Sequence, residues 1–371
     1  MNTVAILTPH YAYNYGAKLQ AFALAEAIRK LGNNIIFINR RPKESYCVSD
    51  KPLHWIHEKE RQTRLKGFIE FEKKFLQPQT LPIYDNADYT NLDFSKYKAI
   101  VVGSDQIWRD SFFYSSFGYS QYLYFIKDDF VRKVSYAASF GKDTCIQPEE
   151  RRKTISLLLK RFDNISVREE SGVTILRNTY GVNGDWVADP TLLHTADFYC
   201  DFFSLSRNDK LSKTLSTYIL ANNLTCMKKC KFIAKSLDCD IYNIYKPTLY
   251  DKIKNHKFLY KLPDFRKIPS IIEWLNIILS SRYILTDSFH GMVFCIIFRK
   301  QFVVLNRKSG GTERYKSLLN LLGLSERLCE WNTTIEQINT LLKKEIDYEK
   351  VYDKLNVFRE KSFVFLVNAI R

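Results

Sequence analysis

The sequence has no apolar run long enough to cross a membrane, since none approaches the roughly 18 uncharged residues that a spanning helix needs. The N-terminus enters an expected strand, Val4–Thr8, without a basic segment ahead of it, so we expect no secretory signal. The eight cysteines are scattered, and their one notable close spacing, Cys226-x-x-x-Cys230, has no matching His/Cys pair nearby. This pattern excludes a zinc site or a disulfide framework and indicates reduced thiols in a cytoplasm.

Common nucleotide-binding and hydrolase motifs are also missing. The chain has no Walker loop, no GxGxxG, no HExxH and no GxSxG. It also lacks a basic helix interleaved with aromatic residues and any recognised nucleic-acid motif. We therefore expect no metal, no cofactor and no nucleic-acid partner.

Acidic residues are in deficit, because 40 Asp and Glu face 56 Lys and Arg, which gives a formal net charge of +16. An anionic lipid or an anionic substrate would explain the surplus of positive charge. A generally basic surface kept for solubility would explain it equally well. Charge alone leaves these interpretations open.

What the chain does have is an alternation of strand and helix patterns over 371 residues, a length typical of about two domains. Its composition, 46% hydrophobic and 26% charged, is that of a globular protein. The alternation predicts an α/β fold with two Rossmann-like domains, residues 1–196 and 197–371, and a linker at Asp197–Lys213. Small ligands usually bind in the cleft between such domains.

The most informative segment is Tyr283–Arg307. An apolar strand, Tyr283 to Thr286, ends in the letters DSFHG, and a helical run to Phe298 and a second strand follow. This is the βαβ unit of an open α/β sheet, which binds ligands at the carboxyl ends of its strands. His290 falls at such an end, beside a helix N-terminus whose backbone N–H groups favour an anion. A histidine buried in a packed βα turn would give the same pattern.

A second motif, Asn14-Tyr15-Gly16-Ala17, follows the first expected strand. A glycine in a strand-to-helix turn lets a ligand approach the backbone, and the next helix presents free N–H groups. A purely structural turn would have the same sequence.

The third motif, VVGSDQIWR, places Asp105 directly after a buried strand. A carboxylate at this position can orient or deprotonate a hydroxyl, and Trp108 offers an aromatic face for a sugar. The structural alternative for Asp105 is a helix N-cap.

The fourth motif, ISVREESG, again runs from a strand into a helix. Arg168 offers a planar fork for a carboxylate or a phosphate at the strand end. The alternative is a salt bridge to Glu169 or Glu170 within the domain.

The chain resembles the polysaccharide pyruvyl transferase family in six segments, in order: NYGAKLQAFAL, VVGSDQIWR, ISVREESG, VADPTLL, TDSFHGMVF and NRKSGGTERYKSLLNLLGL. The resemblance spans nearly the whole chain and is weakest in Arg40–Tyr97 and Asp197–Pro269. It implies a two-domain architecture like that of GT-B glycosyltransferases. It also implies transfer of a pyruvyl group from phosphoenolpyruvate to two hydroxyls of a sugar, as a cyclic ketal. The sugar would belong to a surface polysaccharide or its lipid-linked precursor.

This chemistry assigns roles to the motif residues. Phosphoenolpyruvate carries a carboxylate and a phosphate, so its site needs several cations, and protonation of its methylene carbon needs a general acid. We therefore predict that His290 is this acid and that Asp105 takes up hydroxyl protons. The predicted donor-binding residues are Arg168, Arg307, Lys308, Arg314 and Ser288. The predicted acceptor-binding residues are Asn14, Tyr15, Gly16, Gln106 and Trp108.

One position departs from the family. Many members carry an arginine two residues before the motif histidine, where this chain has Ser288. Either Arg299, Arg307, Lys308 or Arg314 supplies the missing charge, or the donor differs.

Two other functions remain open on the sequence. A GT-B-type glycosyltransferase that uses a nucleotide sugar would place the same histidine against a diphosphate. A non-catalytic glycan- or lipid-binding protein would keep the fold without a working donor site, although Arg168, His290 and the Arg307/Lys308 pair argue against it.

We expect the protein to be in the cytoplasm. We also expect peripheral association with the inner face of the cytoplasmic membrane. The basic charge favours such an association, and so does the C-terminal stretch Phe358–Arg371, which mixes apolar and basic residues. The alternative for that stretch is a helix packed back on the first domain.

Overall fold

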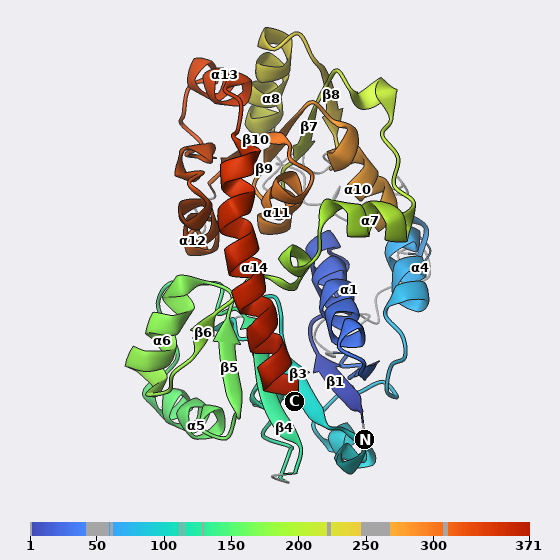
Figure 1. Cartoon of the computed structure of the whole chain (residues 1–371), viewed down its shortest axis with the longest axis vertical. Coiled ribbons are helices and arrows are strands. Elements are labelled where there is room, and N and C mark those ends of the chain that lie inside the picture. The colour runs from blue at the N-terminus through green and yellow to red at the C-terminus, as the bar shows by residue number, and fades with distance from the viewer. Residues whose placement is uncertain are drawn as a thin grey trace, which may run out of the picture.

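The computed structural model describes residues 2–41, 59, 62–110, 113, 116–127, 130–220, 224–245, 268–306 and 311–371. Within these ranges the chain forms two parallel sheets flanked by helices, one domain above the other in Figure 1. This is the α/β arrangement with two Rossmann-like domains that the alternation of strands and helices predicts.

The first sheet has the strand order β2–β1–β3–β4–β5–β6, and its strand pairs are parallel. Its inner strands are short apolar runs, because helices cover both faces. Along β1, Val4 and Ile6 point into one core, and Ala5 and Leu7 point into the other. The strands are β1 Thr3–Leu7, β2 Asn34–Phe37, β3 Ala99–Val102, β4 Arg132–Ala138, β5 Asn164–Val167 and β6 Asp185–Trp186.

The second sheet is also parallel and has the order β11–β10–β9–β7–β8. Its strands are β7 Thr214–Tyr218, β8 Asp240–Asn243, β9 Tyr283–Thr286, β10 Gln301–Leu305 and β11 Leu328–Cys329. The most informative strand of the sequence, β9, has the bounds that its apolar run predicts. It lies at the centre of this sheet, so the turn that follows it is held by neighbours on both sides.

The helices of the first domain are α1 Tyr15–Lys30, α4 Lys66–Phe75, α5 Glu149–Leu159 and α6 Glu170–Tyr180. The later helices are α7 Ala196–Phe203, α8 Leu224–Ser236, α10 Ile271–Ser280, α11 Phe289–Ile297, α12 Glu313–Leu322, α13 Ile335–Lys343 and α14 Tyr348–Ile370. The segment Asp197–Lys213, predicted to be a linker, is largely helical at its start because α7 occupies it. Each described helix is too short or too polar to span a bilayer.

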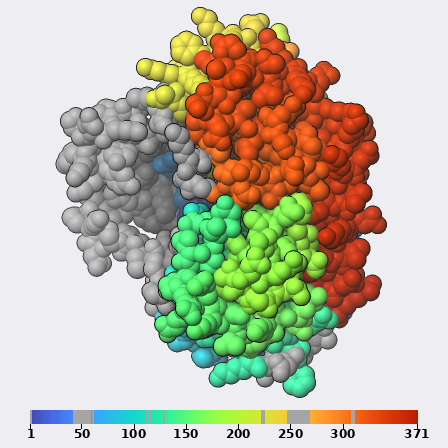
Figure 2. All heavy atoms as spheres, turned by 90° about the vertical axis from the view of Figure 1, so that its left-hand side faces the viewer, coloured from blue at the N-terminus to red at the C-terminus, as the bar shows by residue number. Residues whose placement is uncertain are grey.

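The last helix, α14, extends along both domains (Figure 1). Its first turns bind the second domain, where the Tyr352 hydroxyl donates to the carbonyl of Ile297 at 2.7 Å. Farther along, the Ser362 hydroxyl accepts the backbone N–H of Ala188 of the first domain at 2.8 Å. In Figure 2 the red surface of this C-terminal part runs down one side of the molecule, past the orange upper and green lower halves. One element therefore ties the two domains together.

A buried ion cluster joins α1 to α4 in the first domain. Lys18, whose side chain is fully buried, and Arg41 both donate to the carboxylate of Glu72. Burial raises the pKa of Glu72, but the two cations outweigh it and lower that pKa from 4.5 to about 2. A carboxylate whose pKa is lower in the folded state stabilises the fold above its unfolded pKa. This contribution is lost as the pH falls from about 4.5 to about 2.

We expect Glu72→Gln to lower the free energy of unfolding at pH 7 by about 3 kcal/mol, because the buried ammonium group of Lys18 and the partly buried Arg41 lose the carboxylate that they share. The variant should also lose less stability than the wild type between pH 4.5 and pH 2. Urea unfolding at a series of pH values measures both effects. Glu70→Gln in the same helix is the control, because Glu70 is exposed and its ion pair with the exposed Lys66, at 3.7 Å, contributes little to stability. An acid dependence equal to that of the wild type in Glu72→Gln would contradict the assignment.

Candidate active site

Strand ends from both domains bring the motif residues together. Asp105 follows β3, Arg168 follows β5, and His290 follows β9 at the start of α11. In parallel sheets the carboxyl ends of the strands gather at one edge, so these side chains share a neighbourhood. Across the domain boundary, Nε2 of His290 lies 3.4 Å from Oδ2 of Asp189. We therefore take this boundary as the candidate active site.

Asp189 lies at the centre of this cluster and is only 1% exposed. Its Oδ1 accepts hydrogen bonds from the backbone N–H and the hydroxyl of Thr191, at 3.0 and 2.7 Å. Its Oδ2 accepts from Nη1 of Arg168 at 3.0 Å and from the hydroxyl of Ser104 at 3.2 Å. Nε2 of His290 faces the same oxygen. One carboxylate thus contacts an arginine of its own domain and a histidine of the other.

The surroundings of Asp189 keep it ionised. Burial alone would raise its pKa, because a charged carboxylate is poorly solvated in the interior. His290 and Arg168, together with the hydrogen bond from Thr191, outweigh burial and hold the pKa of Asp189 well below its ordinary value. A permanent negative charge therefore faces the imidazole of His290.

Arg168 is also buried, with 1% of its side chain exposed, and it faces three carboxylates. Besides Asp189, its Nε lies 3.3 Å from Oε1 of Glu169, and its Nη2 lies 3.4 Å from Oδ1 of Asp105. Burial lowers the pKa of Arg168, but Glu169, Asp105 and Asp189 together raise it above its ordinary value. The salt bridge to Glu169, considered on the sequence as the structural alternative, is therefore present.

His290 is held between residues of the first domain. Ser288 caps α11, because its hydroxyl accepts a backbone N–H of the first turn at 3.3 Å. Asp189 lies on the Nε2 side of the ring, and the backbone of Gly16 lies on the Nδ1 side. A Cβ atom added to Gly16 would overlap Nδ1 of His290. Glycine is therefore required where α1 approaches the ring.

Two buried side-chain nitrogens of this cluster make no hydrogen bond within the described residues. Among the described residues, neither Nη2 of Arg168 nor Nε2 of His290 has a partner in hydrogen-bonding geometry, although each lies 3.4 Å from a carboxylate oxygen. A buried donor without a partner costs about 1–3 kcal/mol. Both groups are therefore suited to a ligand that carries acceptor oxygens. Over the same residues, no three His, Cys, Asp or Glu side chains are grouped to hold a metal ion.

The carboxylates around Arg168 differ in accessibility. The side chain of Asp105 is 21% exposed, against 5% for Glu169 and 0% for Asp189. Asp105 also has a left-handed backbone, with φ of +60°, and does not act as the helix N-cap considered on the sequence. It is the carboxylate of this group that a bound molecule can reach.

Two predicted acceptor residues keep polar groups near this site. Asn14 is exposed and caps α1, since its side chain accepts the backbone N–H of Ala17 at 3.2 Å. Gln106 is buried, and its Oε1 accepts from Nη1 of Arg109 at 2.7 Å.

Two other predicted acceptor residues belong to the core. Trp108 is 1% exposed, donates from Nε1 to the carbonyl of Gln121 and stacks on Tyr122 at 5.7 Å between ring centroids. Tyr15 is fully buried and stacks on Trp274 at 5.0 Å. Because both rings are enclosed by other side chains, neither offers a face to a sugar. We correct their assignment to packing residues.

The predicted cations are spread over different places. Arg314 on α12 lies near the boundary, close enough to Arg109 of the first domain that its charge, after burial, lowers the pKa of Arg109. Arg299 lies at the other end of α11 from His290 and pairs with Glu349 at 2.7 Å. It is therefore not the cation that replaces the missing arginine. Arg307 and Lys308 lie outside the described residues.

Two carboxylates of the cluster, Asp189 and Glu169, had no predicted functional role. Asp189 stands in the segment VADPTLL shortly after the short strand β6, as Asp105 stands shortly after β3. Glu169 accepts the hydroxyl of Ser139 at 2.6 Å and so connects β4 to the Arg168 pairs. The position of Asp189 shortly after a strand could have identified it from the sequence. Its contact with His290 is seen only in the structure.

A family described as polysaccharide pyruvyl transferase has a sequence model that matches residues 14–309. The match includes Asp105, Arg168, Asp189 and His290. No curated protein sequence matches the chain.

Solved structures share the fold at low sequence identity. The S. aureus MnaA–UDP co-structure has a TM-score of 0.52 at 12% identity, over 96% of this chain and 91% of that one. A putative UDP-N-acetylglucosamine 2-epimerase from Listeria monocytogenes has a TM-score of 0.53 at 9% identity, over 95% and 90%. Arabidopsis thaliana UGT89C1 complexed with UDP-L-rhamnose has a TM-score of 0.53 at 8% identity, over 99% of this chain and 98% of that one. These likenesses confirm the predicted GT-B-like fold.

We expect Gly16→Ala to lower the free energy of unfolding by about 1–3 kcal/mol, because the new methyl group displaces the ring of His290. In a His290→Ala background the same change should be neutral or stabilise by up to about 1 kcal/mol, since alanine favours a helix over glycine. Urea unfolding of the two single variants and the double variant measures the coupling. Additive effects in this cycle would show that Gly16 and His290 are not in contact.

Proposed function

The chain belongs to the polysaccharide pyruvyl transferase family, and from this premise we propose that it transfers the pyruvyl group of phosphoenolpyruvate to two hydroxyls of a sugar, as a cyclic ketal. The observation that carries the proposal is the meeting of His290 from the second domain with Asp189, Arg168 and Asp105 from the first. A proton donor, a cation and an accessible carboxylate are the groups that this transfer needs.

His290 is the general acid of this proposal. The ionised carboxylate of Asp189 orients the ring and offsets the charge of its protonated form. Since Nε2 and Asp189 make no hydrogen bond in the described part of the chain, the Nε2 proton is available to the methylene carbon of the donor. Asp189 is thus a positioning residue that acts through His290.

Asp105 is the proposed acceptor of hydroxyl protons. Its accessible side chain supports this role, whereas Asp189 and Glu169 are enclosed. Its Oδ1 lies 3.4 Å from Nη2 of Arg168, so a cation stands beside the carboxylate.

The proposed steps balance atoms and electrons. His290 gives a proton to the methylene carbon of phosphoenolpyruvate, and the adjacent carbon becomes electrophilic. A sugar hydroxyl adds to that carbon and gives its proton to Asp105. The bond from this carbon to the phosphate oxygen breaks, and phosphate leaves with the bonding electrons. A neighbouring hydroxyl then adds to the same carbon and gives its proton to the imidazole of His290, which restores the acid and closes the ketal ring. The proton held by Asp105 is released with the phosphate. The co-substrate carries all of this chemistry, so the proposal includes no cofactor and no metal.

The anionic groups of the donor need more than one cation. Arg168 retains an Nη2 donor for a carboxylate or phosphate, but three carboxylates already offset its charge. We therefore propose that Arg314 on α12 contributes a second cation. Arg307 and Lys308 remain predicted donor ligands on the sequence. Ser288 uses its hydroxyl to accept the N–H of Gly291 and its own N–H to bond Thr286, so it shapes the turn that holds His290.

The acceptor is proposed to approach along the start of α1. Asn14 is exposed there, and Gly16 brings the backbone close to His290. Gln106, next to Asp105, is the third proposed acceptor contact. A sugar of a lipid-linked oligosaccharide is the proposed acceptor.

We expect His290→Ala to lower turnover about 10²–10⁴-fold, the range for loss of an acid–base group. The measurement is phosphate release from phosphoenolpyruvate with a panel of lipid-linked or aryl glycosides. Calorimetry should show that Arg168→Lys binds phosphoenolpyruvate more weakly, because lysine lacks the planar fork. Arg177→Gln, an exposed change on α6, should match the wild type in both assays. A folded His290→Ala variant with activity within a few-fold of the wild type would refute the acid role.

We also propose that the protein associates peripherally with an anionic membrane surface at the cytoplasmic face through electrostatic attraction. Phe358 and Leu366 of α14 are buried in the described structure, so the apolar side of this helix is used for packing. The attraction to the membrane would therefore come from the surplus of basic residues. Each Lys or Arg near the anionic membrane surface contributes about 1 kcal/mol.

We therefore expect the protein to co-sediment with liposomes that contain phosphatidylserine at low salt and to dissociate as the salt concentration rises. Liposomes of phosphatidylcholine alone are the matched control. Absence of binding at low salt, or binding that salt does not change, would leave solubility as the reason for the charge.

A further inference from the structure

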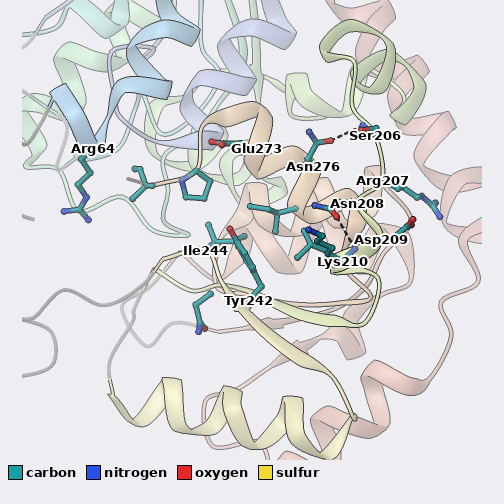
Figure 3. Close-up of a pocket in the computed structure, with 15 residues that line it drawn as sticks. Arg64, Ser206, Arg207, Asn208, Asp209, Lys210, Tyr242, Ile244, Glu273 and Asn276 are labelled. Atoms are coloured by element: carbon teal, nitrogen blue, oxygen red, sulfur yellow. Dashed lines mark hydrogen bonds between the residues drawn. The ribbon is translucent and has the colours of Figure 1, made fainter. Parts of the chain in front are cut away.

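A hollow of about 890 Å³ lies beside α10 and β8, the strand at one edge of the second sheet (Figure 3). One wall is the chain segment 206–211, which leads into β7. Another wall comes from the end of β8 and from the start of α10, and Arg64 reaches it from the first domain. The size suits a small oligosaccharide rather than a single ion.

An aromatic layer separates this hollow from the His290 cluster. Pro269 lines the hollow, and its carbonyl accepts the hydroxyl of Tyr15 at 2.6 Å. The ring of Tyr15 stacks on Trp274, while the next residue, Gly16, contacts His290 on the other side. The hollow is therefore distinct from the active site, yet only one layer of side chains away.

Two asparagines present amide N–H groups to the hollow. Oδ1 of Asn276 accepts the backbone N–H of Ser206 at 3.2 Å, and Oδ1 of Asn208 accepts that of Lys210 at 3.1 Å (Figure 3). A backbone N–H can only donate, so these bonds fix which atom of each amide is the oxygen. Among the described residues, neither Nδ2 group makes a hydrogen bond. Asn243 repeats the pattern, because its Oδ1 accepts the hydroxyl of Thr217 at 2.7 Å.

The charged residues add to this surplus of donors. Arg64, Arg207 and Lys210 line the hollow, against the carboxylates of Asp209 and Glu273. Glu273 already accepts the backbone N–H of Ser270 at 2.6 Å, as part of the capping box of α10. Arg207, Lys210 and the two amides thus give this side of the hollow several hydrogen-bond donors.

Apolar side chains complete the lining, namely Tyr242, Ile244, Pro269 and Ile277. A sugar ring has an apolar C–H face and a rim of oxygen acceptors, so it matches this combination. A phosphate ester would require cations gathered around one point, whereas here amides and cations are spread along the walls. A carboxylate on the sugar would accept hydrogen bonds from Arg207, Lys210 and the two amides.

We propose that this hollow is a binding site for an acidic saccharide, a carboxylate-bearing sugar unit of the polymer on which the enzyme acts. The inference rests on the proposed function in one respect, since a cyclic pyruvate ketal gives the product such a carboxylate. A polymer held here keeps its unmodified sugars at a high effective concentration near His290.

Calorimetry on the His290→Ala protein tests the site without turnover. The first pair of probes is a methyl galactoside that carries a cyclic pyruvate ketal and the same galactoside without it. The second pair is a trisaccharide of galacturonic acid and one of galactose. Both acidic probes should bind, each at least tenfold more tightly than its neutral partner.

Asn276→Asp is the decisive variant, because it keeps the oxygen that accepts the Ser206 N–H and replaces the outward NH₂ with a negative oxygen. It should weaken binding of the acidic probes at least tenfold with an unchanged melting temperature. Asn178→Asp, an exposed change on α6, alters the charge equally and should have no effect. If Asn276→Asp lowers the melting temperature, Arg207→Gln on the exposed segment replaces it, with the same expectation.

The inference is overturned if neither acidic probe binds, if the neutral probes bind equally well, or if the pocket variants bind like the parent. Failure of the wild type to release phosphate from phosphoenolpyruvate, with binding of the acidic probes intact, would overturn the proposed function alone.

Discussion

Because a buried carboxylate is costly unless it is paired, Asp189 needs partners, and these come from both domains. Arg168 and Thr191 satisfy it within the first domain, and His290 faces it from the second. Separation of the domains would remove the contact between Asp189 and His290 and would expose the ring of His290. The same contact that assembles the reactive groups therefore also favours the closed arrangement of the domains. Stability and chemistry share one hydrogen-bonded centre.

The site is locally acidic inside a strongly basic protein. Three carboxylates surround Arg168, although the chain as a whole carries a formal charge of +16. The anionic donor that we propose would therefore need cations besides Arg168, and Arg314 at the border of the cluster is our proposed second cation. The acidic centre has a different use, since it holds Arg168 rigidly and keeps an ionised group beside the imidazole.

Much of the fold follows from local patterns. The apolar run Tyr283–Thr286 predicts β9 with the bounds observed. Motif positions at strand ends also predict that His290, Asp105 and Arg168 gather at one place. What sequence cannot provide is the partner across the boundary, so the pairing of Asp189 with His290 appears only in three dimensions. The predicted acceptor-binding role of Trp108 was wrong for a related reason. In the sequence, an aromatic residue after a strand looks the same whether its side chain faces a sugar or the core.

The helix α14 has a mechanical consequence. With 23 residues it is a stiff rod of about 35 Å. Tyr352 fixes one portion of it to the second domain, and Ser362 and Arg359 fix another to the first, where Arg359 donates to the carbonyl of Leu192 at 2.7 Å. A hinge that bends this rod would have to break one set of attachments. The attachments on both domains oppose twisting for the same reason, so α14 keeps the two walls of the site at a fixed spacing.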